Sequence, residues 1–129
     1  MTLGVDPGTR KCGYALVTGI GATPLVLGIA PTAQLESALQ ALLAEHRIDI
    51  VALGRGTNSQ NVAAIVTGLG LAHALVDERE TSLQARGRFF RDHPPRGWKR
   101  FIPRGMLLPD RPIDDYAALL IAERYLTQR

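Results

Sequence analysis

The sequence has few of the features that place a chain outside the ordinary globular proteins. Cys12 is its only cysteine, so no internal disulfide can form, and no spaced set of Cys and His residues is present to hold zinc. No apolar run approaches the roughly 18 residues needed to cross a bilayer. The N-terminus lacks the basic and then apolar regions of a signal peptide. We therefore expect a soluble, cytoplasmic protein of a reducing compartment, with no membrane partner.

The composition is typical of one folded domain. Hydrophobic residues make up 46% of the chain and charged residues 21%, which is far from a disordered composition. A chain of 129 residues has about the length of one domain and can bury a core without disulfides. The sequence contains no internal repeat and no recognisable linker. We expect a single domain over residues 1–129.

Positive charge is concentrated in one segment. Between Arg79 and Arg104 lie eight Lys and Arg residues against Glu80 and Asp92, a net charge of +6, whereas the whole chain carries +3. The remainder is therefore acidic. A basic segment of this kind indicates a polyanionic partner such as nucleic acid. The alternative is a solvated loop whose arginines keep the protein soluble.

The hydrophobic pattern predicts an α/β order of elements. Three short strands are expected over residues 3–5, 14–17 and 24–32, and Thr32 can then cap a helix over residues 33–46. The pattern continues with a strand at 48–54, a helix at 62–74, a strand at 74–78, and helices at 82–93 and 113–126. Strands joined through helices run parallel by right-handed crossovers. We therefore predict an α/β fold with a five-stranded mixed sheet, in which a three-strand antiparallel meander is extended by parallel strands and flanked by helices.

Three carboxylates fall at the ends of predicted elements. Asp6 follows the first strand, Glu78 follows the fifth, and Asp114 begins the last helix. The carboxyl ends of parallel strands line one crevice, so these groups can meet there. Carboxylate oxygens suit Mg²⁺ or Mn²⁺, and a pair of such ions can promote hydrolysis of a phosphodiester. Each residue also has an ordinary structural explanation, as a turn residue, a partner of Arg79 or a helix cap.

The same residues carry a resemblance to a known family. DPGTRKCGYALV (residues 6–17) resembles the first strand, turn and second strand of RuvC-type Holliday junction resolvases. VDERETSLQAR (76–86) and IDDYAALLIAERYL (113–126) resemble motifs of the YqgF (RuvX) family, resolvase-like proteins also described as pre-16S rRNA processing nucleases. The resemblance spans nearly the whole chain. It implies a ribonuclease H-like fold.

By position, the resemblance makes Asp6, Glu78 and Asp114 the catalytic residues and the ligands of Mn²⁺ or Mg²⁺, with two ions when substrate is bound. Asp115 points about 100° further round the last helix and is the alternative to Asp114. The chain also departs from the RuvC pattern. A glutamate expected after the fourth strand is replaced by Gly54 and Arg55, and a carboxylate one turn along the last helix is replaced by Ala117. The expected cage therefore has three carboxylates, completed by substrate phosphates.

Further residues are candidates for binding nucleic acid. Thr9 and Arg10 adjoin Asp6, while Asn58 and Ser59 precede a helix whose free backbone N–H groups favour anions. The remaining candidates lie in the basic segment: Arg79, Arg86, Arg88, Arg96, Trp98, Lys99, Arg100 and Arg104. Trp98 can stack on an unpaired base or pack on the protein's own core.

The implied function is that of a divalent-metal-dependent nuclease, acting on branched DNA, single-stranded DNA or structured RNA and leaving 5′-phosphate and 3′-hydroxyl ends. Junction resolution would require a two-fold homodimer, whereas single-strand cutting or rRNA processing would not. One alternative is a catalytically inactive nucleic-acid-binding module. Another is an ATP-binding fragment of the actin-like and sugar kinase type, whose phosphate turn DPGTRKCG also resembles, although such proteins need a second domain to enclose the nucleotide.

Overall fold

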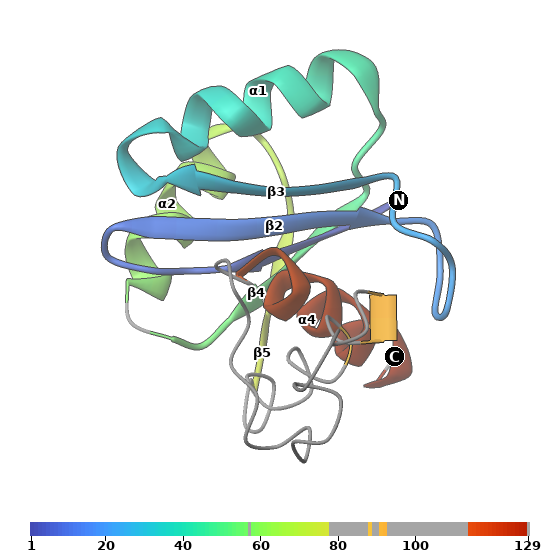
Figure 1. The fold of residues 1–129 in the computed structure, drawn as a ribbon. Coiled ribbons are helices and arrows are strands. Elements are labelled where there is room, and N and C mark those ends of the chain that lie inside the picture. The colour runs from blue at the N-terminus through green and yellow to red at the C-terminus, as the bar shows by residue number, and fades with distance from the viewer. Residues whose placement is uncertain (57, 78–87, 89–90, 93–113, 129) are drawn as a thin grey trace.

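The centre of the structure is a mixed sheet, seen in Figure 1. The computed structural model describes residues 1–56, 58–77, 88, 91–92 and 114–128. Within these residues the strands are β1 (Thr2–Asp6), β2 (Lys11–Val17), β3 (Val26–Pro31), β4 (Ile50–Gly54) and β5 (His73–Val76), in the spatial order β3-β2-β1-β4-β5. β2 is antiparallel to β1 and β3, whereas β1, β4 and β5 are parallel. The predicted five-stranded mixed sheet is confirmed.

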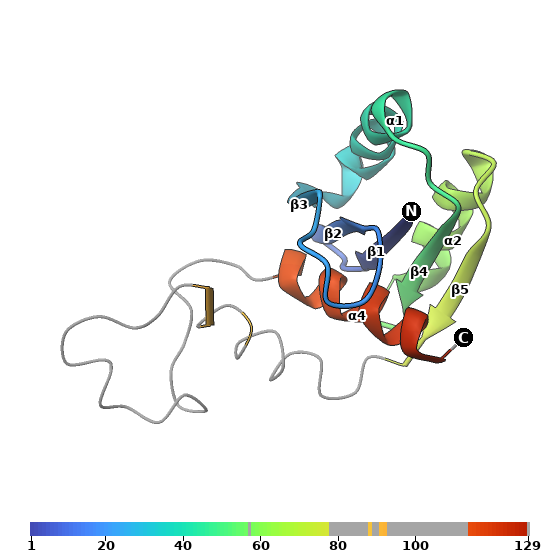
Figure 2. The ribbon, with the colours of Figure 1, turned by 90° about the vertical axis from the view of Figure 1, so that its right-hand side faces the viewer.

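Helices cover both faces of this sheet (Figure 2). A 3-10 turn η1 (Thr32–Gln34) leads into α1 (Leu35–Glu45), which lies on one face together with α2 (Ser59–Gly68). α4 (Asp114–Gln128) crosses the opposite face. Within the described residues, no helix is both long and apolar enough to cross a membrane.

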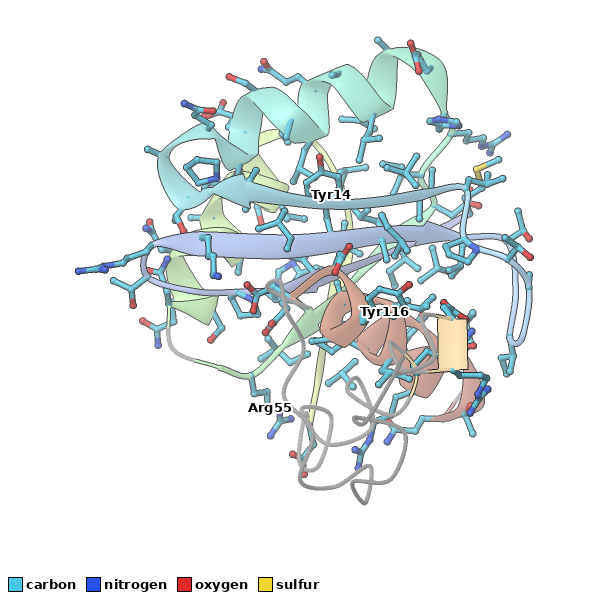
Figure 3. All side chains as sticks on the ribbon, in the orientation of Figure 1. Tyr14, Arg55 and Tyr116 are labelled. Carbon is cyan, nitrogen blue, oxygen red and sulfur yellow. The ribbon has the colours of Figure 1, made fainter. Side chains whose placement is uncertain are left out.

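The alternation of side chains along the strands divides the core into two layers. Leu3 and Val5 of β1 are fully buried against the α1 and α2 layer. The opposite layer is built from small residues of β2, including Ala15, and from the buried face of α4. Figure 3 shows Tyr14 and Tyr116 on the two sides of the sheet, each packed on its own layer.

Two glycines allow α4 to rest directly on the strands. A Cβ added at Gly4 would lie 2.0 Å from the carbonyl oxygen of Ala118, and one added at Gly13 would lie 1.9 Å from that of Asp114. These separations are far below van der Waals contact, so any larger residue would push the helix away. The sequence therefore sets the distance between α4 and the sheet by backbone contact.

The structure corrects two local predictions. The helix predicted over residues 62–74 is α2, which spans Ser59–Gly68, and His73 and Ala74 belong to β5 instead. Thr32 does not cap the following helix: it begins η1, and its Oγ1 donates a hydrogen bond of 2.9 Å to the carbonyl oxygen of Gly8. The hydroxyl is therefore used by the β1–β2 turn rather than by a helix N-terminus. The helix predicted over residues 82–93 and the proline-rich stretch after it fall outside the described residues, apart from Arg88, Arg91 and Asp92.

A candidate acidic site at the carboxyl edge of the sheet

Asp6 ends the central strand β1 on the face covered by α4. Val5 belongs to the opposite layer and Gly4 abuts α4, so alternation directs Asp6 toward α4. In the register of β1 and β2, Asp6 lies opposite Gly13. Its side chain is partly exposed. The predicted position of Asp6, at the end of a buried strand and beside a turn, agrees with the structure.

The first turn of α4 lies beside Asp6. Gly13 is the link, because it is the strand partner of Asp6 and also touches the backbone of Asp114 and Asp115. Carboxylates in the first turn of a helix are favoured by the helix dipole. The fold therefore brings together Asp6 and the acidic start of α4, which are more than 100 positions apart in the sequence.

Asp114 has an incompletely satisfied oxygen. Its Oδ2 is buried and makes no hydrogen bond with any residue that the structure describes. The Nζ of Lys11 lies 3.3 Å from this oxygen, an ion pair whose side chains are 48% exposed for Lys11 and 31% for Asp114. Lys11 was missed at the sequence level. The available signal was alternation, because Lys11 shares the strand face of Gly13 and thus of Asp6.

Asp115 is more deeply buried than Asp114. It is 5% exposed, and its Oδ1 accepts a hydrogen bond of 2.9 Å from the backbone N–H of Tyr116. A carboxylate removed from water in this way needs polar partners or a cation. Asp115 therefore stays the alternative ligand to Asp114.

The third predicted carboxylate, Glu78, lies outside the described residues. β5 ends at Val76, two residues earlier, and Val76 packs with Ile121 in the α4 layer. Gly54 at the end of β4 is the strand partner of Val76. Because glycine has no carboxylate, this position supplies no ligand between Val76 of β5 and Asp6 of β1. Among the residues described there is no group of three His, Cys, Asp or Glu that could hold a metal ion.

The donor set nevertheless suits a hard divalent cation. Carboxylate oxygens are the ligands that Mg²⁺ and Mn²⁺ prefer. The buried oxygen of Asp114, which lacks a hydrogen bond, is the kind of atom that a bound cation would satisfy. Asp6 and either Asp114 or Asp115 can therefore form part of such a site, with further ligands from Glu78 or substrate.

The turn after Asp6 is fastened by a shared acceptor. The carbonyl oxygen of Gly8 accepts hydrogen bonds from Thr32 Oγ1 at 2.9 Å and Asn58 Nδ2 at 3.0 Å, and the Sγ of buried Cys12 lies at 3.8 Å. Asn58, a predicted nucleic-acid contact, thus uses its amide to hold the turn, and its φ of 73° places it in the left-handed region. The turn that carries Thr9 and Arg10 is therefore fixed to the start of α2.

A shallow hollow lies in front of α2, and exposed polar residues surround it. The hollow has a volume of about 630 Å³ and is lined by residues that include Asn58 and Ser59. On the neighbouring turn, Thr9 and Arg10 are both exposed. These four predicted contacts therefore lie near the carboxyl edge of the sheet, with Thr9 and Arg10 exposed and Asn58 and Ser59 partly exposed.

Arg55 follows β4, at the position where RuvC-like sequences are expected to have a glutamate (Figure 3). Its backbone N–H donates to the carbonyl oxygen of Val76 at 3.1 Å. The guanidinium is exposed and has no ion-pair partner in the described part of the chain.

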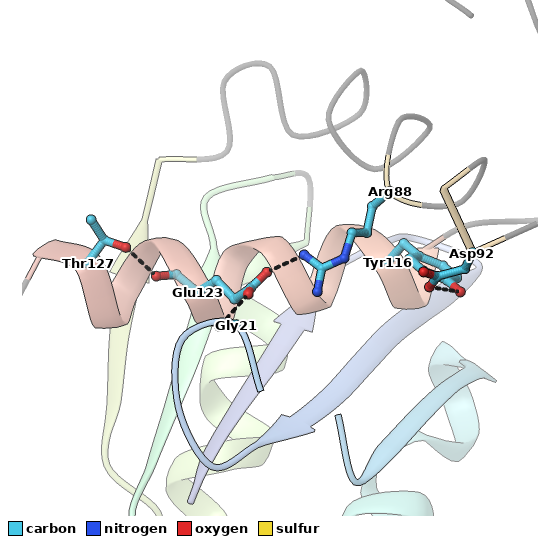
Figure 4. Close-up of polar contacts among 6 residues, drawn as sticks. All are labelled: Gly21, Arg88, Asp92, Tyr116, Glu123 and Thr127. Atoms are coloured by element: carbon cyan, nitrogen blue, oxygen red, sulfur yellow. Dashed lines mark hydrogen bonds and ion pairs between the residues drawn. The ribbon is translucent and has the colours of Figure 1, made fainter. Parts of the chain in front are cut away.

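The described part of the basic segment is tied to α4 (Figure 4). Arg88 Nη1 lies 2.8 Å from Oε1 of Glu123, whose Oε2 accepts a hydrogen bond of 3.1 Å from the backbone N–H of Gly21. Tyr116 donates a hydrogen bond of 2.9 Å to Oδ2 of Asp92. The charge of Arg88, a predicted nucleic-acid contact, is thus paired within the protein. The other candidates of this segment lie outside the described residues: Arg79, Arg86, Arg96, Trp98, Lys99, Arg100 and Arg104.

Asp49 is a surface carboxylate at the amino edge of the sheet, just before β4. The N-terminal ammonium of Met1 donates a hydrogen bond to Asp49, and Arg47 lies 3.4 Å from the same carboxylate. The ammonium beside it holds the pKa of Asp49 below its ordinary value of 3.8. Asp49 lies at the end of the sheet opposite to Asp6, because it precedes the parallel strand β4.

Comparison with solved structures identifies the fold. The chain superimposes on Thermus thermophilus RuvC in complex with a Holliday junction substrate with a TM-score of 0.57 at 17% identity, covering 94% of this chain and 89% of that one. A second T. thermophilus RuvC structure gives a TM-score of 0.56 at 19% identity, with the same coverage. The fold is the ribonuclease H-like fold of RuvC. No family model and no curated protein matches the sequence.

Proposed function

We propose that the protein is a divalent-metal-dependent nuclease that hydrolyses phosphodiester bonds in structured or single-stranded nucleic acid. The observation that carries this proposal is the meeting of Asp6 with the acidic first turn of α4 at the carboxyl edge of a RuvC-like sheet. The RuvC neighbour is itself complexed with a Holliday junction substrate. The concentration of positive charge in residues 79–104 suits the same kind of polyanionic partner.

In this proposal Asp6, Asp114 and Glu78 hold Mg²⁺ or Mn²⁺, with Asp115 as an alternative to Asp114. A divalent cation bound to such oxygens makes water a stronger nucleophile and offsets negative charge on the phosphate. The carboxylates orient the reacting phosphate by fixing where this positive charge lies. Water attacks phosphorus in line with the departing 3′-oxygen, so the products carry a 5′-phosphate and a 3′-hydroxyl.

The remaining polar residues bind the substrate. The exposed Thr9 and Arg10 lie on the turn next to Asp6, which the hydrogen bonds to Gly8 fasten in place. Basic residues contact phosphates and give affinity without sequence preference. We therefore expect the protein to recognise the shape and strandedness of nucleic acid more than its sequence.

A YqgF-like role is the finer form of this proposal. The VDERETSLQAR motif and the absence of a carboxylate at Gly54 favour it over a strict RuvC-like role. Its substrate would be structured RNA such as an rRNA precursor, whereas a RuvC-like role would require a homodimer acting on branched DNA.

The test is cleavage of a labelled panel by the wild type and by Asp6→Asn. The panel comprises a four-way DNA junction, single-stranded DNA, duplex DNA and a structured RNA, each with Mn²⁺, Mg²⁺ or EDTA. We expect metal-dependent cutting that Asp6→Asn abolishes while binding persists. Asp49→Asn is the matched control, because it removes a carboxylate from the opposite end of the sheet.

The preferred substrate then separates RNA processing from junction resolution. Binding without cutting by the wild type under every metal condition would contradict the nuclease and leave the nucleic-acid-binding module in its place.

A further inference from the structure

The side chains of Lys11 and Asp114 meet at the candidate site. Lys11 begins β2 and Asp114 begins α4, and their charged groups approach to 3.3 Å at Oδ2 of Asp114. That oxygen is buried and has no hydrogen bond from any described residue. A buried acceptor without a hydrogen bond is costly to leave alone. The ammonium of Lys11 is thus the positive charge that accompanies it in this structure.

The ion pair is loose. Charge-assisted hydrogen bonds between an ammonium and a carboxylate are normally about 2.7–2.9 Å long, and this contact is longer. Nearly half of the Lys11 side chain is exposed. Partly exposed pairs of this kind contribute little to stability, so a second cation can replace the ammonium at Asp114 at small cost.

We propose that Lys11 is the resident counter-ion of the site and competes with a divalent cation for Oδ2 of Asp114. The inference rests on the proposed function, because it concerns the metal that the nuclease would use. An ammonium and a divalent cation cannot share one oxygen without strong like-charge repulsion. Lys11 therefore acts as a positioning residue that neutralises Asp114 without metal and lowers the metal affinity of the free protein.

This arrangement makes metal uptake depend on substrate. Bringing phosphates to the site adds negative charge, which attracts both the divalent cation and the displaced ammonium. Lys11 is the first residue of β2 and is next to the exposed Arg10, so the displaced ammonium can contact an anion bound there. The free protein would thus bind metal weakly, and the complex with nucleic acid would bind it more tightly.

Calorimetric titration of Mn²⁺ into the full chain without nucleic acid tests this inference. Lys11→Gln should bind Mn²⁺ roughly three- to tenfold more tightly than the wild type, because both the competing pair and the repulsion are lost. Lys11→Arg, which keeps a positive charge near Asp114, should stay close to the wild type. Arg47→Gln is the matched control, since it removes an exposed charge at the opposite end of the sheet, and it should change the affinity less than twofold.

Asp114→Asn should lose Mn²⁺ binding, and adding Lys11→Gln to that variant should not restore it, because Lys11 acts through Asp114. Mn²⁺ binding that Lys11→Gln leaves unchanged or weakens would overturn the competition while leaving the proposed nuclease intact. If neither the wild type nor Lys11→Gln takes up Mn²⁺, the inference is overturned, while the proposed nuclease is judged separately by cleavage of the labelled panel. Thermal unfolding of each variant without metal verifies that the fold is kept.

Discussion

Two carboxylates on the same helix are held in different ways. Glu123 has a partner on each oxygen, Arg88 at 2.8 Å and the backbone N–H of Gly21 at 3.1 Å, and its side chain is 14% exposed. Asp114 has a buried Oδ2 with no hydrogen bond from any described residue, and Lys11 lies 3.3 Å away. Both belong to α4, so the difference comes from what surrounds the helix and not from its backbone.

The difference separates a carboxylate that holds the fold together from one that is suited to bind a ligand. Glu123 joins α4 to the β2–β3 hairpin and to Arg88, so removing it would leave a partly buried guanidinium unpaired. Removing one member of a buried pair costs far more than the pair itself contributes. Asp114 has Lys11 as its ion-pair partner among the described residues. Substituting Asp114 would remove a buried oxygen that has no hydrogen bond from any described residue.

The largest effect is expected from Gly13→Ala, which disturbs one end of α4 only. The new Cβ would overlap the backbone of Asp114 and Asp115, so the start of the helix must move. We expect a loss of about 3 kcal/mol in the free energy of unfolding, measured with urea, together with loss of Mn²⁺ binding. Gly19→Ala is the control, because its added Cβ would have nothing within 4 Å. Equal stability of the two variants would show that the helix does not rest on the strand.

Glu123→Ala should come next. The substitution removes the ion-pair partner of Arg88 and the hydrogen-bond acceptor of the Gly21 N–H. We expect it to lower the free energy of unfolding by about 2 kcal/mol. Urea unfolding gives this value, and the exposed Glu36 of α1 supplies the control Glu36→Ala. A loss no larger than in that control would remove Glu123 from the residues that hold the fold.

Asp114→Asn should show the reverse pattern. We expect a change in stability of less than about 1 kcal/mol, because the pair with Lys11 is long and partly exposed, but a loss of Mn²⁺ binding and of cleavage. Urea unfolding and calorimetry on the same preparation report the two effects. Retention of metal binding by Asp114→Asn, with loss in Asp115→Asn, would move the ligand to the neighbouring residue.

The smallest effect concerns a third carboxylate, Asp49. Its pKa is lowered by the N-terminal ammonium of Met1, so ionised Asp49 stabilises the folded state above its ordinary pKa of 3.8. This contribution is lost as the pH falls from about that value through the lowered folded pKa. Thermal unfolding between pH 7 and pH 2 should therefore fall slightly less steeply for Asp49→Asn. An identical acid limb in both proteins would contradict the interaction.

Local patterns in the sequence were enough to predict the sheet and the position of Asp6 at its carboxyl edge. Alternation and the turn that begins with Pro7 and Gly8 place Asp6 at the end of a buried strand, and the apolar run up to Gly54 predicts a parallel strand covered on both faces. These signals depend on a few neighbouring residues, so they can be recognised in the sequence alone.

The contacts of Lys11 with Asp114 and of Arg88 with Glu123 could not be predicted in the same way. Each joins residues far apart in the chain, and no periodic pattern marks which charge will meet which. The prediction that Thr32 caps a helix was wrong for a related reason. Its hydroxyl donates a hydrogen bond to the carbonyl oxygen of Gly8, which is far away in the sequence. The position of Glu78 and the contacts of the basic segment beyond Arg88 and Asp92 remain predictions.

The placement of α4 on β1 has a consequence for the order of events during synthesis. The site is built from the first strand and from a helix that begins at Asp114, so its two halves must find each other across a very long stretch of chain. Contacts of such sequence separation form late and slowly. During synthesis, Asp6 therefore lacks the acidic first turn of α4 until the chain has been extended past that helix, and the candidate site is not assembled before then.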